Sequence, residues 1–169
     1  MDVFEAIEKR YSVRGYKPDP VEDEKLKQVL EAARRAPTAA NRQPFRVLVV
    51  HTRDREQELA RVYGRRWFTR APLVVGFVAV TGEAWRRMDD KPYDEVDATI
   101  AMDHLVLAAT ALGLGTCWIA AFDPDAAREV FGLPDDVELV ALTPLGYPDK
   151  PPASTDRRPL EELVRYERW

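Results

Sequence analysis

Residues 97–120, with the sequence DATIAMDHLVLAATALGLGTCWIA, form the most informative run of the chain. Nearly every position from 97 to 112 is apolar, and the polar residues Thr99, Asp103 and Thr110 fall close to one narrow stripe of a helix. A helix with so small a polar face must be enclosed on most of its sides. We therefore predict a buried central helix over 97–112, part of whose cover comes from a second subunit.

Helices and strands alternate on both sides of this central helix. Gly113 and Gly115 end it, and a strand is predicted from 116 to 121. Such alternation ordinarily suggests a parallel α/β sheet, but the irregular connection from 80 to 97 leaves the strand directions open. No repeat or linker divides the sequence, so we expect one domain over residues 1–169. The other expected elements are a helix capped by Asp2 and Glu5 with Phe4 and Ile7 facing inward, a helix with the apolar stripe Leu26, Val29, Leu30 and Ala33, strands at 45–50, 73–80 and 137–145, and short helices capped by Asp54 and by Asp123-Pro124.

The composition excludes several classes of protein. With 169 residues, 46% of them hydrophobic and 32% charged, the chain is long enough to bury a sizeable core. Its net charge of −4 and its dispersed arginines argue against nucleic-acid binding. The apolar run 71–80 is too short to span a bilayer, and the acidic N-terminus is unlike a signal peptide. A single cysteine, Cys117, suits a reducing compartment, so we expect a cytoplasmic protein that does not bind membranes.

The run RYSVR at residues 10–14 is the strongest candidate for a binding site. Alternate side chains of an extended segment share a face, so Arg10, Ser12 and Arg14 would present two guanidiniums and a hydroxyl on one side. That combination suits a phosphate or another anion. The alternative is a solvated, charged turn after a helix.

Two further polar stretches complete this hypothesis. Arg157 and Arg158 form a second cationic pair near the end of the chain. The loop from Pro37 to Pro44 lies just before a predicted strand and contains Asn41, the one asparagine of the sequence. We predict that these two stretches and residues 10–14 form one ligand cradle.

Other chemistries find little support in the sequence. His51 and His104 belong to no cluster with the spacing of metal ligands, and no Gly-x-Ser-x-Gly motif marks a nucleophilic serine. Cys117 is expected to be a small buried hydrophobe, and a cysteine-dependent enzyme is the weakest alternative. The run 113–115 follows a helix and precedes a strand, the reverse of a dinucleotide fingerprint. An enzyme-sized chain of this kind is typical of a protein whose cofactor performs the chemistry.

Five short motifs follow one another in a recognisable order: KRYSVR at 9–14, the loop at 37–44, residues 97–119, PLGYP at 144–148 and RRPL at 157–160. Together they resemble the FMN-dependent nitroreductase family over nearly the whole chain. The resemblance implies an α+β fold, in which a mostly antiparallel central sheet is flanked by helices, and an intertwined homodimer with FMN at its interface. It also implies ping-pong electron transfer from NADH or NADPH to nitroaromatic compounds, quinones or similar small acceptors.

The resemblance also implies where the cofactor binds. Arg10 and Ser12, with Tyr11 between them, would hold the phosphate and ribityl chain of FMN. Arg14 would lie near the pyrimidine edge of the ring, where a cation raises the reduction potential. No side chain is implied as a catalytic group, because the chemistry is centred on the flavin. The remaining implied contacts are Arg157 and Arg158 at the phosphate, the backbone of Ala120 and Ala121 at the ring nitrogen that accepts hydride, and, from the partner subunit, Pro37, Thr38, Ala39, Asn41 and Gln43.

One departure from the family pattern and two open alternatives remain. Residues 38–40 are Thr-Ala-Ala where many members have serines, so the partner loop offers fewer side-chain hydrogen bonds. The segment 82–96, with Trp85, Met88 and Tyr93, either covers the flavin as a substrate lid or lies on the surface. The alternative to an enzyme is a protein that binds flavin or another phosphorylated ligand without turnover, as a carrier or sensor.

Overall fold

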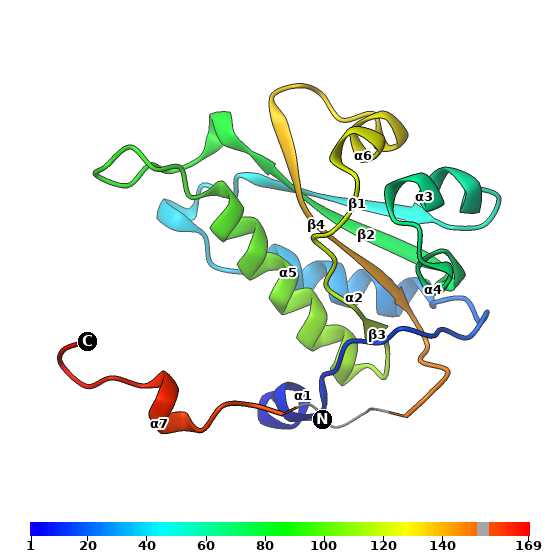
Figure 1. Ribbon diagram of the computed structural model, residues 1–169, viewed down its shortest axis with the longest axis horizontal. Coiled ribbons are helices and arrows are strands. Elements are labelled where there is room, and N and C mark those ends of the chain that lie inside the picture. Colours follow the sequence, from blue (N-terminus) through cyan, green and yellow to red (C-terminus); the bar gives the residue numbers. More distant parts are fainter. Residues whose placement is uncertain (152–155) are drawn as a thin grey trace.

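A four-stranded antiparallel sheet organises the computed structural model, which describes residues 1–151 and 156–169. Each neighbouring pair of strands is antiparallel. This finding confirms the sheet implied by the family resemblance and contradicts the parallel arrangement that the alternation of elements suggests. The strands are β1 (Phe45–His51), β2 (Leu73–Val80), β3 (Gly115–Thr116) and β4 (Val137–Gly146), in the order β1-β2-β4-β3 (Figure 1).

The central strand β2 explains how the layers are arranged. Residues 73–79 are all buried, because both faces of the sheet are covered. Val75 and Phe77 point into a cluster around α5 (Asp94–Ala111), whereas Val74 and Val78 point into a second cluster on the opposite face. Because side chains alternate along the strand, this one apolar run contributes residues to both clusters.

Helices cover both faces of the sheet (Figure 1). The long helix α5 packs with α2 on the first face, and side chains of three shorter helices fill the second cluster. Two 3-10 turns lie next to the sheet: η1 precedes β1, and η2 follows β2. The bounds are Asp23–Arg34 for α2, Glu56–Val62 for α3, Arg66–Arg70 for α4, Pro124–Phe131 for α6, Ala39–Asn41 for η1 and Thr81–Glu83 for η2.

The predicted central helix is confirmed as α5, which begins three residues earlier than expected. Its face toward the sheet is buried, while Thr99 and Asp103 are exposed on the predicted polar stripe. Gly113 ends the helix with a φ of 77°, a left-handed conformation that costs glycine little. Neither α5 nor any other helix in the described ranges is long and apolar enough to cross a membrane.

Two of the three predicted helix caps are confirmed. At the start of α1 (Val3–Lys9), the Asp2 carboxylate accepts from the backbone N–H of Glu5 at 2.9 Å, and Glu5 returns a bond to the Asp2 N–H at 3.0 Å. Asp123 caps α6 by accepting from the N–H of Ala126 at 2.9 Å. Both helices begin where a short side-chain acceptor satisfies an otherwise free donor.

Two local predictions are wrong. Asp54 does not cap α3, because it takes a left-handed φ of 65° and the helix begins after Arg55. The strand expected over 116–121 stops at Thr116 and continues only as an isolated bridge to β4. An irregular segment therefore replaces the predicted strand.

The two ends of the chain leave apolar side chains uncovered. Phe4 is 79% exposed and Ile7 is 54% exposed, so the prediction that they face inward is wrong within one protomer. The segment that carries α7 (Leu160–Leu163) extends away from the body (Figure 1). Its large apolar residues are also exposed, namely Leu160, Leu163, Tyr166 and Trp169.

Candidate functional site

The segment 10–14 lies along the edge of the sheet beside β3. The Val13 N–H donates to the carbonyl of Thr116 at 2.8 Å, in a parallel bridge between Ser12 and Thr116. The approach is so close that a Cβ on Gly115 would lie 2.6 Å from a methyl carbon of Val13. Only glycine permits this contact, so Gly115 fixes where the N-terminal segment lies.

Val13 and Arg14 differ in burial as the predicted alternation requires. Val13 is 3% exposed and packs in a small cluster with Tyr16, whose hydroxyl donates to the Val13 carbonyl at 3.0 Å. Arg14 is exposed, and Arg10 and Ser12 are half-buried. The apolar face anchors the segment, and the polar face remains available.

Cys117 follows Thr116, the residue that pairs with Ser12 in the parallel bridge. Burial raises the pKa of its thiol, and the charges of Arg14 and Arg10 oppose this shift only in part. Because the thiolate form is disfavoured, the structure does not favour Cys117 as a nucleophile.

Tyr11 points away from this polar face. Its hydroxyl donates to the carbonyl of Lys150 at 2.7 Å, and its ring lines an apolar cavity of about 350 Å³ beside the C-terminal end of α5. Burial, followed by the charge of Asp149, raises the pKa of the phenol. The tyrosine thus holds the segment against the chain that follows β4, and its contact with a cofactor stays a prediction.

The segment after β3 presents free backbone donors. The Cys117 N–H donates to Thr143 Oγ1 at 3.0 Å, and Ile119 exchanges two backbone bonds of 2.9 Å with Leu142. These bonds fix the path of the chain up to Ala120 and Ala121, which are exposed. Within the described residues, the N–H groups of both alanines have no hydrogen-bond acceptor.

The predicted arginine pair lies in the C-terminal segment. Arg157 and Arg158 are exposed, and the Arg157 guanidinium donates to the carbonyl of Asp156 at 2.9 Å. No hydrogen bond among the described residues joins either arginine to Arg10 or Ser12. Their convergence on one ligand stays a prediction.

The predicted polar loop lies at the other end of α5 (Figure 1). The Ala39 N–H donates to Asp97 Oδ1 at 2.9 Å, in the first turn of the helix. Fifteen residues separate Asp97 from Leu112 next to β3, which corresponds to about 22 Å along the helix axis. Within one chain, the loop is therefore not brought together with residues 10–14.

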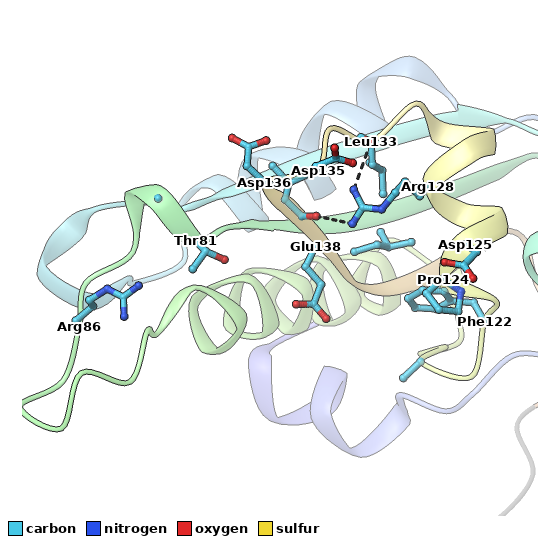
Figure 2. Close-up of a pocket in the computed structure, with 14 residues that line it drawn as sticks. Thr81, Arg86, Phe122, Pro124, Asp125, Arg128, Leu133, Asp135, Asp136 and Glu138 are labelled. Atoms are coloured by element: carbon cyan, nitrogen blue, oxygen red, sulfur yellow. Dashed lines mark hydrogen bonds between the residues drawn. The ribbon is translucent and has the colours of Figure 1, made fainter.

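A cavity of about 750 Å³ lies where β4 begins, between α6 and the end of β2 (Figure 2). Ala120 forms part of its wall, so it adjoins the segment with free donors. Arg128 braces the wall by donating to the carbonyls of Leu133, Pro134 and Val137. Sequence patterns do not reveal this cavity, because its lining comes from two distant stretches of the chain, 81–86 and 120–139. Its exposed acids are Asp125, Asp135, Asp136 and Glu138.

Residues 84–93, the middle of the segment 82–96, form a small hairpin between η2 and α5. The Tyr93 N–H donates to the carbonyl of Trp85 at 3.0 Å, and the two rings meet edge to face at 5.6 Å. Met88 near its tip is fully exposed. The Arg42 side chain joins the hairpin to the polar loop through the carbonyl of Ala84 at 3.2 Å. Its role as a lid stays a prediction.

An antiparallel α+β fold with a cationic face at one sheet edge is the class of protein that these observations describe. The sequence model of the nitroreductase family matches residues 7–67 and 53–147. These two matches cover well over half of the chain. The protein therefore belongs to the nitroreductase family.

Two curated relatives extend over nearly the whole chain. The NADH dehydrogenase of Thermus thermophilus is 30% identical over 195 residues, covering 97% of this chain and 95% of the relative. The FMN reductase [NAD(P)H] of Bacillus subtilis is 28% identical over 185 residues, covering 99% of this chain and 74% of the relative. Both are named as enzymes that oxidise a nicotinamide cofactor.

Solved structures confirm the nitroreductase fold. A nitroreductase family protein of Clostridium difficile has a TM-score of 0.92 and 38% identity, and the match covers all of both chains. A protein of Desulfovibrio desulfuricans, solved in complex with FMN, has a TM-score of 0.84 and 27% identity, covering 100% of this chain and 98% of that one.

Proposed function

We propose that this protein uses bound FMN to transfer electrons from NADH or NADPH to nitroaromatic compounds, quinones or similar small acceptors by a ping-pong sequence. The enzyme class, an FMN-dependent NAD(P)H oxidoreductase, follows from membership of the nitroreductase family. The observation that carries the proposal is the anchored segment 10–14, which holds Arg10, Ser12 and Arg14 beside β3, the strand that leads to the N–H groups of Ala120 and Ala121. When bound, FMN would supply the capacity to accept a hydride and pass its electrons on.

The N-terminal segment supplies the groups that a phosphate needs. The Arg10 guanidinium and the Ser12 hydroxyl lie on one face of an anchored segment, so both can donate to the same anionic oxygen atoms. Arg157 and Arg158 would approach the phosphate from the C-terminal segment. Their exposure and their lack of a carboxylate partner among the described residues leave them available.

The backbone after β3 would orient the flavin ring. The N–H groups of Ala120 and Ala121 are exposed donors on a segment that Ile119 holds against β4. Small side chains at both positions allow a flat ring to approach the backbone closely. Arg14, on the same side of the sheet edge, would place its positive charge beside the polar edge of the ring.

The other wall of the site would come from a partner subunit. The loop residues lie about 22 Å along α5 from the groups at the sheet edge, so one protomer does not assemble both halves. A two-fold dimer with exchanged halves would bring them together and make two equal sites. The residues that we assign to the partner's wall are Pro37, Thr38, Ala39, Asn41 and Gln43.

The exposed apolar residues support a homodimer. Phe4 and Ile7 are uncovered on α1, and Leu160, Tyr166 and Trp169 are uncovered on the C-terminal segment. Single apolar side chains are common on surfaces, but large ones that cluster on two terminal elements indicate an interface. We propose that each C-terminal segment packs against the other subunit.

The electron acceptor would be selected beside the flavin. The hairpin within 82–96 is joined to the polar loop, so it would reach the partner's site together with that loop. Trp85 and Tyr93 give the hairpin a rigid aromatic base. The proposed compartment is the cytoplasm, where NADH and NADPH are supplied.

The decisive experiment is anaerobic mixing of the purified, FMN-loaded protein with NADH and with NADPH. We expect the visible flavin absorption to bleach with at least one donor and to return when a nitroaromatic compound or a quinone is added. A protein that binds FMN but does not bleach with either donor would be a carrier or sensor. A protein that binds no FMN would contradict the proposal altogether.

A further inference from the structure

The loop after α2 adopts a conformation that its residues do not favour on their own. Ala40, Asn41 and Gln43 all have positive φ values, of 51°, 54° and 54°. None of the three is glycine, and alanine in particular gains nothing from the left-handed region. A loop with three such residues in four positions must be held in place by its surroundings.

Hydrogen bonds within the loop give it shape but do not fix it to the body of the protein. Thr38 Oγ1 accepts from the Gln43 N–H at 3.1 Å, and the Gln43 side-chain amide donates to the Asn41 carbonyl at 3.1 Å. The Asn41 N–H donates back to the Thr38 carbonyl at 3.0 Å. All of these groups move together if the loop moves as a unit.

Asp97 supplies the buried side-chain attachment of this unit to the body, in addition to the backbone bond of 2.9 Å from the Val80 N–H to the Pro44 carbonyl at the end of the loop. Asp97 Oδ1 accepts from the Ala39 N–H at 2.9 Å, across 58 positions of sequence. The other side-chain bond from the loop to a different segment comes from Arg42, whose side chain is exposed and reaches the carbonyl of Ala84. The Asp97 carboxylate sits on α5, the most enclosed helix of the fold, and therefore offers a rigid support.

The buried carboxyl group of Asp97 lowers the stability of the fold. The residue is only 1% exposed, and its Oδ2 is buried without any hydrogen-bond partner among the described residues. Burial raises the pKa of this carboxyl, with a smaller contribution from the nearby Asp94. A buried carboxylate with an unsatisfied oxygen destabilises a fold. The gain in stability from one hydrogen bond does not explain its presence.

We propose that Asp97 is a positioning residue that holds the Ala39 N–H and thereby sets the loop conformation required to hold FMN. This inference rests on the proposed function, because the loop is assigned there to the flavin of the partner subunit. Asp97 acts through the loop and does not touch the cofactor in this proposal.

Three substitutions separate this role from a merely structural one. Asp97→Asn keeps an oxygen acceptor of nearly the same shape, whereas Asp97→Leu removes the acceptor and keeps a side chain of similar length. Asp94→Leu is the matched control, because Asp94 lies in the same helical turn, is 3% exposed, and accepts from Thr81 rather than from the loop. Ala39→Pro removes the donor instead and leaves Asp97 intact, so the contact is also tested if Asp97→Leu fails to fold.

The measurements are hydrogen exchange of the loop amides and titration of each apoprotein with FMN. We expect the Ala39 amide to exchange about tenfold faster or more in Asp97→Leu, and FMN affinity to fall by about tenfold or more, the effect of leaving the Ala39 N–H without its acceptor. Asp97→Asn should restore both values to near those of the wild type, and Asp94→Leu should change neither. In Ala39→Pro, the Asn41 and Gln43 amides should exchange faster and FMN affinity should fall.

Each contrary outcome has a distinct meaning. Unchanged loop exchange in Asp97→Leu and Ala39→Pro would overturn the inference, whatever the protein does with flavin. Faster exchange with unchanged FMN affinity would overturn the link between the loop and the cofactor. Equal losses in Asp94→Leu and Asp97→Leu would assign the effect to the start of α5 and overturn the specific role of Asp97. A wild-type protein that binds no FMN would overturn the flavin part through the failure of the proposed function itself, while its loop exchange would still report on the contact.

Discussion

The two ends of α5 present different kinds of functional group. At the C-terminal end, flexible charged and hydroxyl side chains project from a segment that Val13 anchors beside β3. At the N-terminal end, Asp97 holds the backbone of a loop in which three residues other than glycine have positive φ values. The first end is suited to binding an anion, and the second is suited to presenting a shaped surface.

This difference indicates why one protomer is not sufficient. A ligand with a phosphate at one end and a flat ring at the other needs both kinds of group within its own length. The helix keeps them about 22 Å apart in one chain. The same rigid element that builds the core therefore makes a second copy necessary for the proposed site.

The largest expected effect comes from combining two defective variants. Arg10→Glu damages the cationic face, and Ala39→Trp fills the space assigned to the ring. Each homodimer should lose FMN binding. If the halves come from different subunits, every mixed dimer contains one intact site, so an equal mixture should recover about a quarter of the wild-type sites.

The recovery is measured as bound flavin per protomer in mixed dimers isolated with two different affinity tags, which should bind about half as much FMN as the wild type. Each variant mixed with itself is the control. A mixed dimer that binds no FMN would mean that both halves belong to one subunit, which would contradict the interpretation of α5 as a separator.

A smaller effect is expected from Arg10→Ala alone. Removing one charge-assisted contact should weaken FMN binding by about 1.5–3 kcal/mol, or roughly 10- to 150-fold in Kd, as measured by fluorescence titration. Arg34→Ala is the matched control, because Arg34 is an exposed arginine engaged by Glu31 on the outer face of α2. Equal affinities of Arg10→Ala and the wild type would remove Arg10 from the cationic end.

Arg14→Ala should alter the electronic properties of the cofactor more than its affinity. A positive charge near the ring favours the extra negative charge taken up on reduction, so its loss should lower the midpoint potential of bound FMN. The measurement is anaerobic equilibration with a reference dye, with Arg34→Ala again as the control. An unchanged potential in a variant that retains FMN would contradict the role assigned to Arg14.

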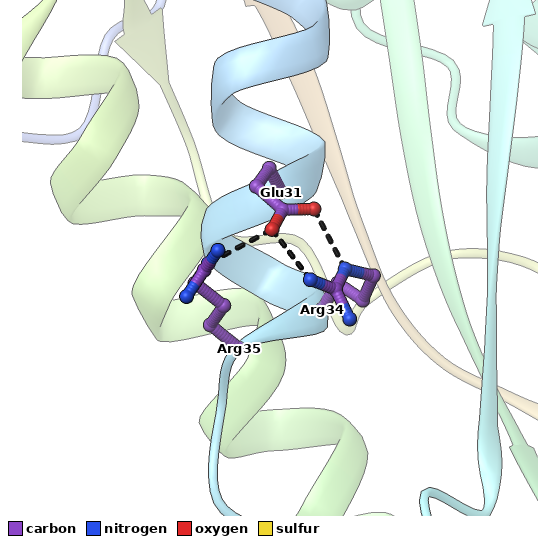
Figure 3. A network of polar contacts seen from close by, with 3 residues as sticks. All are labelled: Glu31, Arg34 and Arg35. Carbon is purple, nitrogen blue, oxygen red and sulfur yellow. Dashed lines mark hydrogen bonds and ion pairs between the residues drawn. The ribbon is translucent and has the colours of Figure 1, made fainter.

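The smallest effect concerns an exposed carboxylate, which sharpens the contrast with the buried Asp97. Glu31 accepts two hydrogen bonds from Arg34, each of 2.6 Å, and one of 2.8 Å from Arg35, at the last turn of α2 (Figure 3). Hydrogen bonding with Arg34, followed by that with Arg35, lowers the pKa of Glu31 to about 2 from its ordinary value of 4.5. The ion cluster should therefore stabilise the fold above pH 4.5, and this stabilisation should be lost as the pH falls toward 2.

The measurement is the Tm of the wild type and of Glu31→Gln across this pH range. The difference should be small at neutral pH, because all three side chains are exposed to solvent, and it should vanish near pH 2. Asp97→Asn should differ in sign, with a Tm equal to or above that of the wild type at neutral pH. A large loss of stability in Asp97→Asn would show that the buried carboxylate is retained for the fold.

Much of the architecture was accessible from residue patterns. The enclosed helix, the capping box of Asp2 and Glu5, the cap at Asp123 and the buried strands follow from local periodicity and hydrogen-bonding capacity. The prediction that Asp54 caps α3 is wrong because its backbone is left-handed, a conformation that the local sequence does not predict. The prediction of a strand over 116–121 is wrong because β4 pairs with only part of that segment.

The candidate site was also predictable from the sequence only in part. The alternation of residues 10–14 was predictable because a two-residue period is an intrinsic property of extended backbone. Asp97 was missed as a functional residue, since an acid in the first turn of a helix ordinarily signals only the helix dipole. Asp94, in the same turn, is also a buried acid, so the sequence does not single out Asp97, and its partner, Ala39, lies 58 positions away.

The sequence by itself determined which residues are apolar, which segments have helical or extended periods, and which side chains carry the charge for an anion. These properties depend on residues a few positions apart, so the local sequence determines them. Tertiary structure alone decided the antiparallel strand order, the distance between the two ends of α5, and the carboxylate that supports the loop. Those features depend on packing between distant segments, where the hydrophobic effect rewards burial without specifying which buried polar atom finds a partner.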